Sequence, residues 1–328
     1  METNPFNDLY EILSGDMETV DSLINKRMFS EQAPVIHELT NHLINAGGKR
    51  LRPLLTLASA NLCNYKGNYH IHLAAVVEFI HTATLLHDDV IDESLQRRGR
   101  PTANLLWDNK SSVLVGDYLF SRAFQLMVET GSLKVLKSLS DASAEISESE
   151  VLQMSLARNL RVTNSQYMQV IRGKTATLFA SACEVGGIIA DAKASEINAL
   201  RYFGEAIGIS FQIVDDFLDY AGLKLSLGKN VGDDFRERKI TLPVIKSLET
   251  KNSKTHEFWK RTFVTGKQNK YDFDKAREIL ETDGSLDKTR QEAIKWAKKA
   301  KLQLQYLPNG DMNNLLSDLT QFVVSRVR

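Results

Sequence analysis

Two clusters of aspartates stand out because each lies late in a segment that is otherwise apolar. They are Asp88-Asp89-Val90-Ile91-Asp92 and Asp215-Asp216-Phe217-Leu218-Asp219. In a helix, residues four apart lie on one face a single turn apart, so the first and last aspartate of each cluster would share a face. Like charges in apolar surroundings destabilise a protein unless something neutralises them. One such cluster would more often be a solvated helix end, but two in one chain are hard to explain as surface decoration.

The residue types in the clusters indicate which cation could neutralise them. Carboxylates without histidine or cysteine favour Mg²⁺, which binds few carboxylates directly and leaves coordination positions for water and phosphate oxygens. The pattern therefore predicts a site for Mg²⁺ and a diphosphate.

Basic side chains recur at places that could meet this diphosphate. Two glycines precede Lys49 and Arg52 in the segment AGGKRLRP, which lets the backbone approach an anion. Further cations are Arg97, Arg98, Arg100, Lys174, Lys229 and Lys239. Each alone would be a surface cation, whereas together they could bind more negative charge than one diphosphate carries. The segment Gly173-Lys174-Thr175 does not indicate ATP or GTP, because a P-loop needs glycine where this chain has Met168.

The overall composition excludes several classes of protein. Hydrophobic residues make up 43% and charged residues 25% of the 328 residues, as in an ordinary globular protein. The 41 basic and 41 acidic residues give zero net charge, which argues against a nucleic-acid partner and a polybasic membrane surface. Cys63 and Cys183 show no disulfide or zinc spacing, so we expect a cytoplasmic protein. We expect no signal peptide and no transmembrane segment, because no long apolar run occurs.

The elements that must position these groups are predicted to be helices. Apolar residues recur at helical spacing along the chain, which predicts an all-α fold. The segment 72–92 is apolar almost all round and should be a helix at the centre of a bundle. Further helices are predicted around 111–130, 134–160, 164–190, 194–222, 271–283, 286–305 and 311–326, the last three on the outside with solvated charges. No repeat or linker is apparent, so we expect one domain over residues 1–328.

The motifs and their order resemble those of the trans-isoprenyl diphosphate synthases, and among these the long-chain polyprenyl enzymes of octaprenyl or decaprenyl type that serve ubiquinone biosynthesis. The resemblance spans about residues 30–250 and is carried by GGKRLRP, EFIHTATLLHDDVID, RRGRPT, VLVGDYLFSRAF, KTATLF, FQIVDDFLDY and LGKNVGDD followed by KITLP. It implies a single large helical bundle of the isoprenoid synthase type, usually a homodimer, with a deep central cavity. Arg238 stands where relatives often carry glycine.

The resemblance also implies roles for individual residues. The ligands of about three Mg²⁺ ions per active site would be Asp88, Asp92 and Asp215, supported by Asp89, Asp216 and Asp219. The groups that hold the allylic diphosphate, farnesyl or geranylgeranyl diphosphate, would be Arg97, Lys174, Thr175, Gln212, Lys229 and Lys239. The pocket for isopentenyl diphosphate would comprise Lys49, Arg52, His81 and Arg98.

The chemistry of such an enzyme fits this inventory. Breaking the allylic C–O bond leaves a carbocation and a diphosphate anion, so the site needs dense positive charge around the leaving group. The isopentenyl double bond then attacks the carbocation, and loss of a proton gives a product one isoprene unit longer. The departing diphosphate can accept that proton, so no side-chain nucleophile is required.

Product length should depend on residues one turn before the first cluster. Ala83 is small beside Thr84, so the growing chain could pass toward the neighbouring helix and its residues Phe120, Ala123, Phe124 and Met127, unless these are plain core residues. A geranylgeranyl-length product stays open.

Two other classes of protein stay open as well. A class I terpene cyclase also uses an aspartate-rich motif but usually pairs it with a different second motif. A non-catalytic subunit of a heteromeric synthase should show a broken cluster, whereas both clusters are intact.

Overall fold

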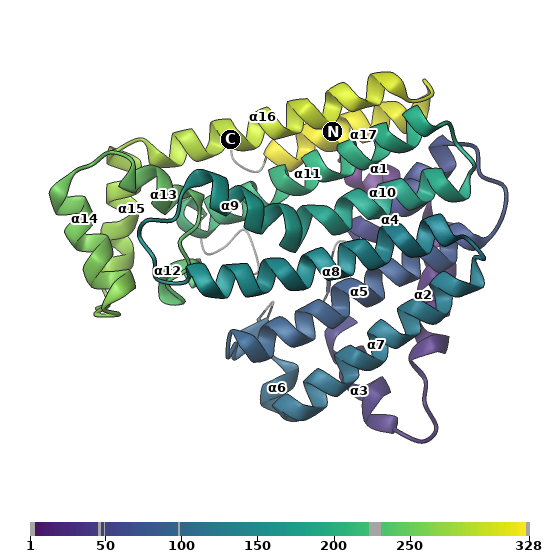
Figure 1. Ribbon diagram of the computed structural model, residues 1–328, viewed down its shortest axis with the longest axis horizontal. Helices are drawn as coiled ribbons and strands as arrows, with labels where there is room; N and C mark the ends of the chain where they lie inside the picture. The colour runs from purple at the N-terminus through teal and green to yellow at the C-terminus, as the bar shows by residue number, and fades with distance from the viewer. Residues whose placement is uncertain (1–3, 45–46, 49, 98, 223–230, 326–328) are drawn as a thin grey trace.

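The computed structural model describes residues 4–44, 47–48, 50–97, 99–222 and 231–325, and these form helices almost throughout (Figure 1). The first half contains α1 (Pro5–Ile12), α2 (Ser14–Met28), α3 (Pro34–Ile44), α4 (Leu51–Leu62), α5 (Tyr69–Ile91), α6 (Ala103–Leu106), α7 (Asn109–Glu129) and α8 (Leu133–Leu156). The second half contains α9 (Asn164–Ile171), the π-helix η1 (Arg172–Ala176), α10 (Thr177–Ile189), α11 (Ala194–Ala221), α12 (Asp233–Arg236), α13 (Leu242–Leu248), α14 (Ser253–Trp259), the π-helix η2 (Lys260–Val264), α15 (Asp272–Thr282), α16 (Ser285–Gln303), the 3₁₀ turn η3 (Leu304–Tyr306) and α17 (Asp311–Ser325). The predicted all-α class is confirmed.

Strand structure within the described ranges is confined to one short hairpin after α5. Its strands β1 (Gln96–Arg97) and β2 (Arg100–Pro101) are antiparallel, and Arg97 pairs with Arg100. This hairpin carries Arg97 back toward the end of α5.

The core is built where the long helices pack on one another. In Figure 1, α16 packs on α11, α11 on α10, α10 on α8 and α4, and α5 on α7. As predicted from its sequence, α5 lies in the middle, and its residues from Leu73 to Val77 are completely buried. Among the described helices, none is long and apolar enough to cross a membrane.

One sequence expectation about the helices differs from the structure. The predicted helix over 164–190 is interrupted by η1, which inserts one extra residue into the turn that carries Lys174. The helix α16 lies on the outside of the bundle, as predicted, and its residues Lys288, Lys295 and Lys298 are exposed. Its residues Ala293, Ala297 and Ala300 are buried against the core, because small side chains let α16 approach α11 closely.

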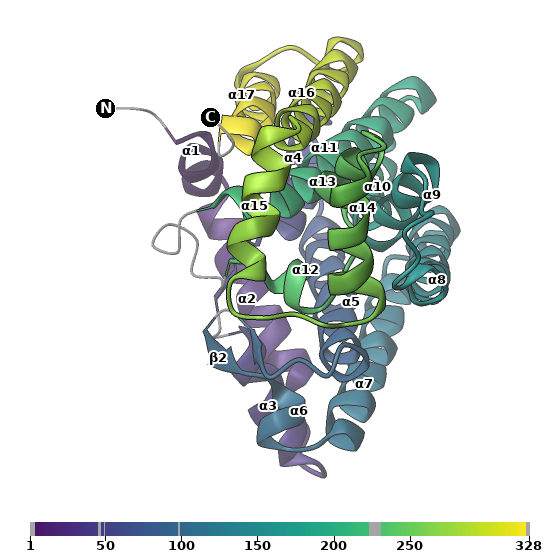
Figure 2. The ribbon, with the colours of Figure 1, turned by 90° about the vertical axis from the view of Figure 1, so that its left-hand side faces the viewer.

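A second, aromatic core holds the segment after α11. Figure 2 shows α12, α14 and α15 gathered at one end of the molecule. Phe235 of α12 packs there among Trp259, Phe263 and Phe273, with ring centroids 5.5 to 6.5 Å away. This packing fixes the segment that leads to Lys239.

Candidate active site

The two aspartate clusters lie at the C-terminal ends of α5 and α11. Two lysines from other segments form ion pairs with the first cluster. Lys239, which follows α12, places its Nζ 2.8 Å from Oδ2 of Asp92. Burial and the charge of Asp219 raise the pKa of Asp234, which lies on α12 beside the second cluster, and the charge of Lys239 opposes that rise. Lys174 of η1 places its Nζ 3.6 Å from Oδ2 of Asp88. The structure thus brings the two predicted clusters and two of the predicted cations to one site.

Within each cluster the aspartates differ in exposure. Asp88, Asp92 and Asp215 are half-buried, so their carboxylates can reach a ligand. Asp89 and Asp216 are buried, at 0% and 4% exposure. This pattern separates the three predicted metal ligands from two of the residues predicted to support them.

Asp89 is held by Arg97 of the hairpin. Arg97 donates from Nε to Oδ1 and Oδ2 of Asp89, at 2.9 and 3.1 Å, and its Nη2 lies 2.8 Å from Oδ1. Burial raises the pKa of Asp89 above its usual value, and the bonds from Arg97 oppose that rise. Most of the Arg97 guanidinium is therefore engaged with Asp89, although a contact with the allylic diphosphate was predicted for it.

Lys174 has a carboxylate partner that sequence reasoning missed. Its Nζ lies 2.7 Å from Oε1 of Glu150 on α8. Burial raises the pKa of Glu150, Lys174 lowers it, and the charge of Asp88 raises it further. A Cβ on Gly173 would overlap the Ser149 hydroxyl, so only glycine lets η1 approach α8 this closely. A glutamate that meets a lysine from another helix leaves no local signal in the sequence.

The second cluster is tied to η1 and α9 by hydrogen bonds. Thr175 donates from Oγ1 to Oε1 of Gln212 at 2.8 Å, and Nε2 of Gln212 donates to Oδ1 of Asp216 at 2.8 Å. Tyr167 of α9, also missed from the sequence, donates from its hydroxyl to Oδ2 of Asp216 at 2.6 Å. Burial raises the pKa of Asp216 to about 8, with a further rise from Asp234, while its two donors oppose the rise.

Asp219 organises the start of α12. Its Oδ1 accepts the backbone N–H groups of Gly232 and Asp233, at 3.2 and 3.1 Å, and its Oδ2 accepts that of Asp234 at 3.0 Å. Burial raises the pKa of Asp219 to about 6, although these three bonds lower it. The carboxylate of Asp219 therefore holds the backbone of the segment beside the site.

Arg238 and Lys239 follow α12. Arg238 has a φ of 61°, in the left-handed region that glycine adopts without strain. Burial works to lower the pKa of Lys239, but Asp92 and Glu237 outweigh burial and raise the pKa above its ordinary value. Lys239 therefore stays charged.

The residues predicted to hold isopentenyl diphosphate lie in part between α4 and α5. Nη1 of Arg52 lies 3.3 Å from Nε2 of His81, and the Arg52 guanidinium lies 4.4 Å from the centre of the Phe179 ring. The neighbouring Arg50 has a φ of 49° and an Nη1 that lies 2.8 Å from Oε1 of Glu78. The structure thus places Arg52 and His81 together, while Lys49, Arg98 and Lys229 lie outside the described residues.

Of the residues predicted to control product length, Ala83, Thr84 and Phe120 are buried or half-buried, whereas Phe124 is exposed. Ala83 is completely buried, and Thr84 donates its hydroxyl to the His81 carbonyl at 2.8 Å. Phe120 is half-buried, with its ring 6.1 Å from that of His87. Phe124 differs from the prediction, because it is 43% exposed. It follows buried Ala123 directly, and one helical step of about 100° turns its side chain outward.

The donor set of the site fits Mg²⁺. The groups that converge are carboxylates, and their mutual repulsion contributes to the raised pKa values of Asp89 and Glu150. In the part of the chain that the structure describes, no three histidine, cysteine or acidic side chains could hold a metal ion by themselves. Mg²⁺ sites of this kind usually complete their coordination with substrate phosphates and water. Asp88, Asp92 and Asp215 would therefore share the ion with a diphosphate.

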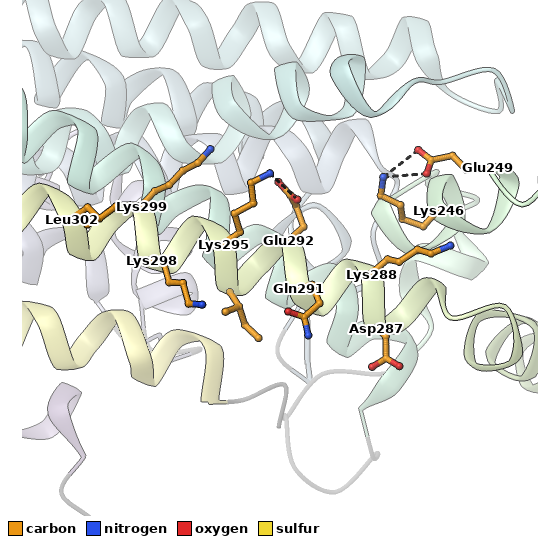
Figure 3. Close-up of a pocket in the computed structure, with 11 residues that line it drawn as sticks. Lys246, Glu249, Asp287, Lys288, Gln291, Glu292, Lys295, Lys298, Lys299 and Leu302 are labelled. Carbon is orange, nitrogen blue, oxygen red and sulfur yellow. Dashed lines mark hydrogen bonds and ion pairs between the residues drawn. The ribbon is translucent and has the colours of Figure 1, made fainter.

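A separate hollow of about 790 Å³ lies between α13 and α16 (Figure 3). Its lining includes the ion pairs Lys246–Glu249 and Lys295–Glu292, at 3.1 and 3.5 Å. None of its lining residues belongs to the predicted site, so this hollow is not the candidate active site.

A helical bundle with an aspartate cluster at the C-terminal end of each of two long helices is the arrangement of the isoprenoid synthases. Residues 33–280 match the family model described as polyprenyl synthetase. The chain belongs to the polyprenyl synthetase family and is a prenyltransferase.

Relatives align with almost the whole chain. The octaprenyl diphosphate synthase of Escherichia coli is 41% identical over 318 residues, which cover 97% of this chain and 98% of that protein. The crystal structure of a decaprenyl diphosphate synthase from Rhodobacter capsulatus is 56% identical, with a TM-score of 0.95 and coverage of 98% and 99%. A polyprenyl synthase from Caulobacter crescentus, complexed with calcium and isoprenyl diphosphate, is 46% identical, with a TM-score of 0.94 and coverage of 98% and 97%.

Proposed function

We propose that the protein is a Mg²⁺-dependent trans-polyprenyl diphosphate synthase that adds isopentenyl diphosphate units to an allylic diphosphate. The observation that carries the proposal is that Lys174 and Lys239 contact the first aspartate cluster, while Asp219 of the second cluster accepts the backbone N–H of Asp234, whose carbonyl accepts the backbone N–H of Lys239. The similar octaprenyl and decaprenyl synthases support a product of octaprenyl to decaprenyl length. We propose that this product supplies the side chain of ubiquinone. The Caulobacter structure, which holds a divalent cation and an isoprenyl diphosphate, supports the ligand class.

In this proposal the half-buried aspartates Asp88, Asp92 and Asp215 hold the metal. Bound Mg²⁺ would neutralise the diphosphate and so favour its departure as the leaving group. Lys174 and Lys239 already lie beside the first cluster and add positive charge where the diphosphate oxygens would bind. Arg52 and His81, which contact each other beside α4, would orient isopentenyl diphosphate.

We further propose a single domain and a homodimer formed through the outer face of α7. Leu114, Phe124 and Val128 share one side of this helix and are 66%, 43% and 64% exposed. Exposed Asp117 and Ser121 lie between them on the same side, and apolar side chains with polar neighbours are typical of a protein interface. Most soluble oligomers pair identical surfaces about a two-fold axis. Light scattering on the eluted protein should give twice the mass of one chain. Leu114→Lys should give a monomer, whereas Leu302→Lys, at an equally exposed site on α16, should not.

We also propose that the enzyme works in the cytoplasm. Two features support this: both cysteines are free, and a reducing compartment keeps thiols in that state.

The proposed reaction can be tested with purified protein, Mg²⁺, isopentenyl diphosphate and farnesyl diphosphate. Wild type should form product by itself, and Asp88→Ala should lose at least about a hundredfold in turnover, as loss of a preorganised charge contact at a reacting centre does. Asp141→Ala is a matched control, because Asp141 is an exposed aspartate paired with Lys137 on α8. Wild-type protein that forms no product until a second protein is added would support the non-catalytic subunit instead.

A further inference from the structure

A chain of hydrogen bonds behind the second aspartate cluster has a defined direction. Asp216 accepts at both oxygens, from the Tyr167 hydroxyl and from Nε2 of Gln212, at 2.6 and 2.8 Å. Oε1 of Gln212 in turn accepts from the Thr175 hydroxyl at 2.8 Å. The nitrogen end of the Gln212 amide thus faces Asp216, and its oxygen end faces Thr175.

This direction decides which groups can donate to a bound anion. A glutamine amide has two N–H donors, and one of them is directed at Asp216, which leaves the second. A threonine hydroxyl has one proton, and that of Thr175 is directed at Gln212. Diphosphate oxygens are acceptors, so in this arrangement Gln212 can donate to them and Thr175 cannot.

Burial supports the same assignment. Gln212 is half-buried, and it lies one turn before the predicted metal ligand Asp215 on α11. Thr175 is only 6% exposed. Tyr167 on α9 is 4% exposed. Its hydroxyl binds Oδ2 of Asp216, whereas Gln212 binds the other carboxylate oxygen. Without Tyr167 the carboxylate of Asp216 would lose one of its two fixed donors and could turn away from the amide.

We propose that Tyr167 is a positioning residue that acts through Asp216 to turn an N–H of Gln212 toward the allylic diphosphate. Thr175 then orients the amide and does not itself donate to the substrate. This inference rests on the proposed function, because it assumes an allylic diphosphate beside Asp215.

The first test compares Tyr167→Phe with Tyr220→Phe. Tyr220 is a matched control: it is completely buried, it lies four residues after Asp216, and its hydroxyl has no hydrogen-bond partner in the described part of the chain. We expect Tyr167→Phe to raise the KM for farnesyl diphosphate about tenfold, the usual effect of one oriented hydrogen bond. The KM for isopentenyl diphosphate should stay within about twofold, and Tyr220→Phe should leave both constants unchanged.

The second test compares Thr175→Val with Gln212→Met and keeps the proposal falsifiable if Tyr167→Phe does not fold. Calorimetry with Mg²⁺ and inorganic pyrophosphate should show a loss of affinity about tenfold for Gln212→Met and threefold or less for Thr175→Val. A larger loss for Thr175→Val would overturn the assignment, as would a Tyr167→Phe variant whose two KM values rise together or stay at the wild-type values. If wild type itself does not turn over farnesyl diphosphate, it is the proposed function that fails.

Discussion

Replacing Arg97 with methionine should lower the free energy of unfolding, because Arg97 compensates the buried charge of Asp89. Asp89 is completely buried, and its carboxylate is held by Nε and Nη2 of Arg97. Removing one partner of a buried ion pair costs about 3–5 kcal/mol, because the remaining charge stays buried without compensation. Since the Arg97 side chain is 28% exposed, water can partly replace it, so we expect a loss near the lower limit, about 3 kcal/mol.

The loss of stability should depend on pH in a defined direction. Burial already raises the pKa of Asp89 in the folded wild type, and Arg97 opposes that rise. Without Arg97 the folded-state pKa rises further above the unfolded value of 3.8. A folded state that binds the proton more tightly loses stability as pH rises from the unfolded pKa through the folded pKa. The deficit of Arg97→Met relative to wild type should therefore grow as pH rises above the folded-state pKa of Asp89 in wild type.

Urea unfolding at several pH values measures this deficit. Adding Asp89→Asn to Arg97→Met should recover most of the lost free energy of unfolding, since the buried charge is then gone. Arg27→Met is the matched control, because it breaks the more exposed Arg27–Glu129 pair at 2.7 Å and should cost about 1 kcal/mol or less. A deficit for Arg97→Met below about 1 kcal/mol at every pH, or one that shrinks as pH rises, would refute this reasoning.

Three other predictions concern the loop, the product and the metal. Arg238→Gly should change the free energy of unfolding by less than about 1 kcal/mol, because relief of the left-handed strain offsets the greater freedom of glycine in the unfolded chain. The KM for the allylic substrate should be measured as well. A large rise in this KM would indicate that the Arg238 side chain contacts the substrate. Ala83→Tyr should shorten the product sharply because it places a bulky ring at a buried position on α5, and an unchanged chain-length distribution by mass spectrometry would contradict the tunnel model. Treatment with EDTA should abolish turnover and excess Mg²⁺ should restore it; full activity in the chelator would show that the aspartate clusters do not act through a metal.

The parts of the fold that depend on local sequence could be predicted. The apolar run before Asp88 predicted a central helix, and α5 is buried along most of its length. The two aspartate clusters could be recognised as a candidate site because charged residues are rare in apolar segments. Each cluster comes at the end of its apolar helical segment, so its position at a helix end could also be predicted.

Other features could not be predicted because they depend on contacts between distant segments. The roles of Glu150 and Tyr167 follow from partners on other helices. The π-helix at Lys174 depends on the close approach of Gly173 to α8, which helical periodicity does not record. The solvated lysines of α16 could be predicted, whereas the contact of its buried alanines with α11 could not, because it depends on a helix far away in the sequence.

The central claim concerns what this site makes, and the mass of the product tests it most directly. Purified protein, Mg²⁺, farnesyl diphosphate and excess isopentenyl diphosphate should yield an all-trans product of octaprenyl to decaprenyl length. A product that stops at geranylgeranyl diphosphate would contradict the long-chain assignment, and a cyclised hydrocarbon with release of diphosphate would contradict the assigned reaction.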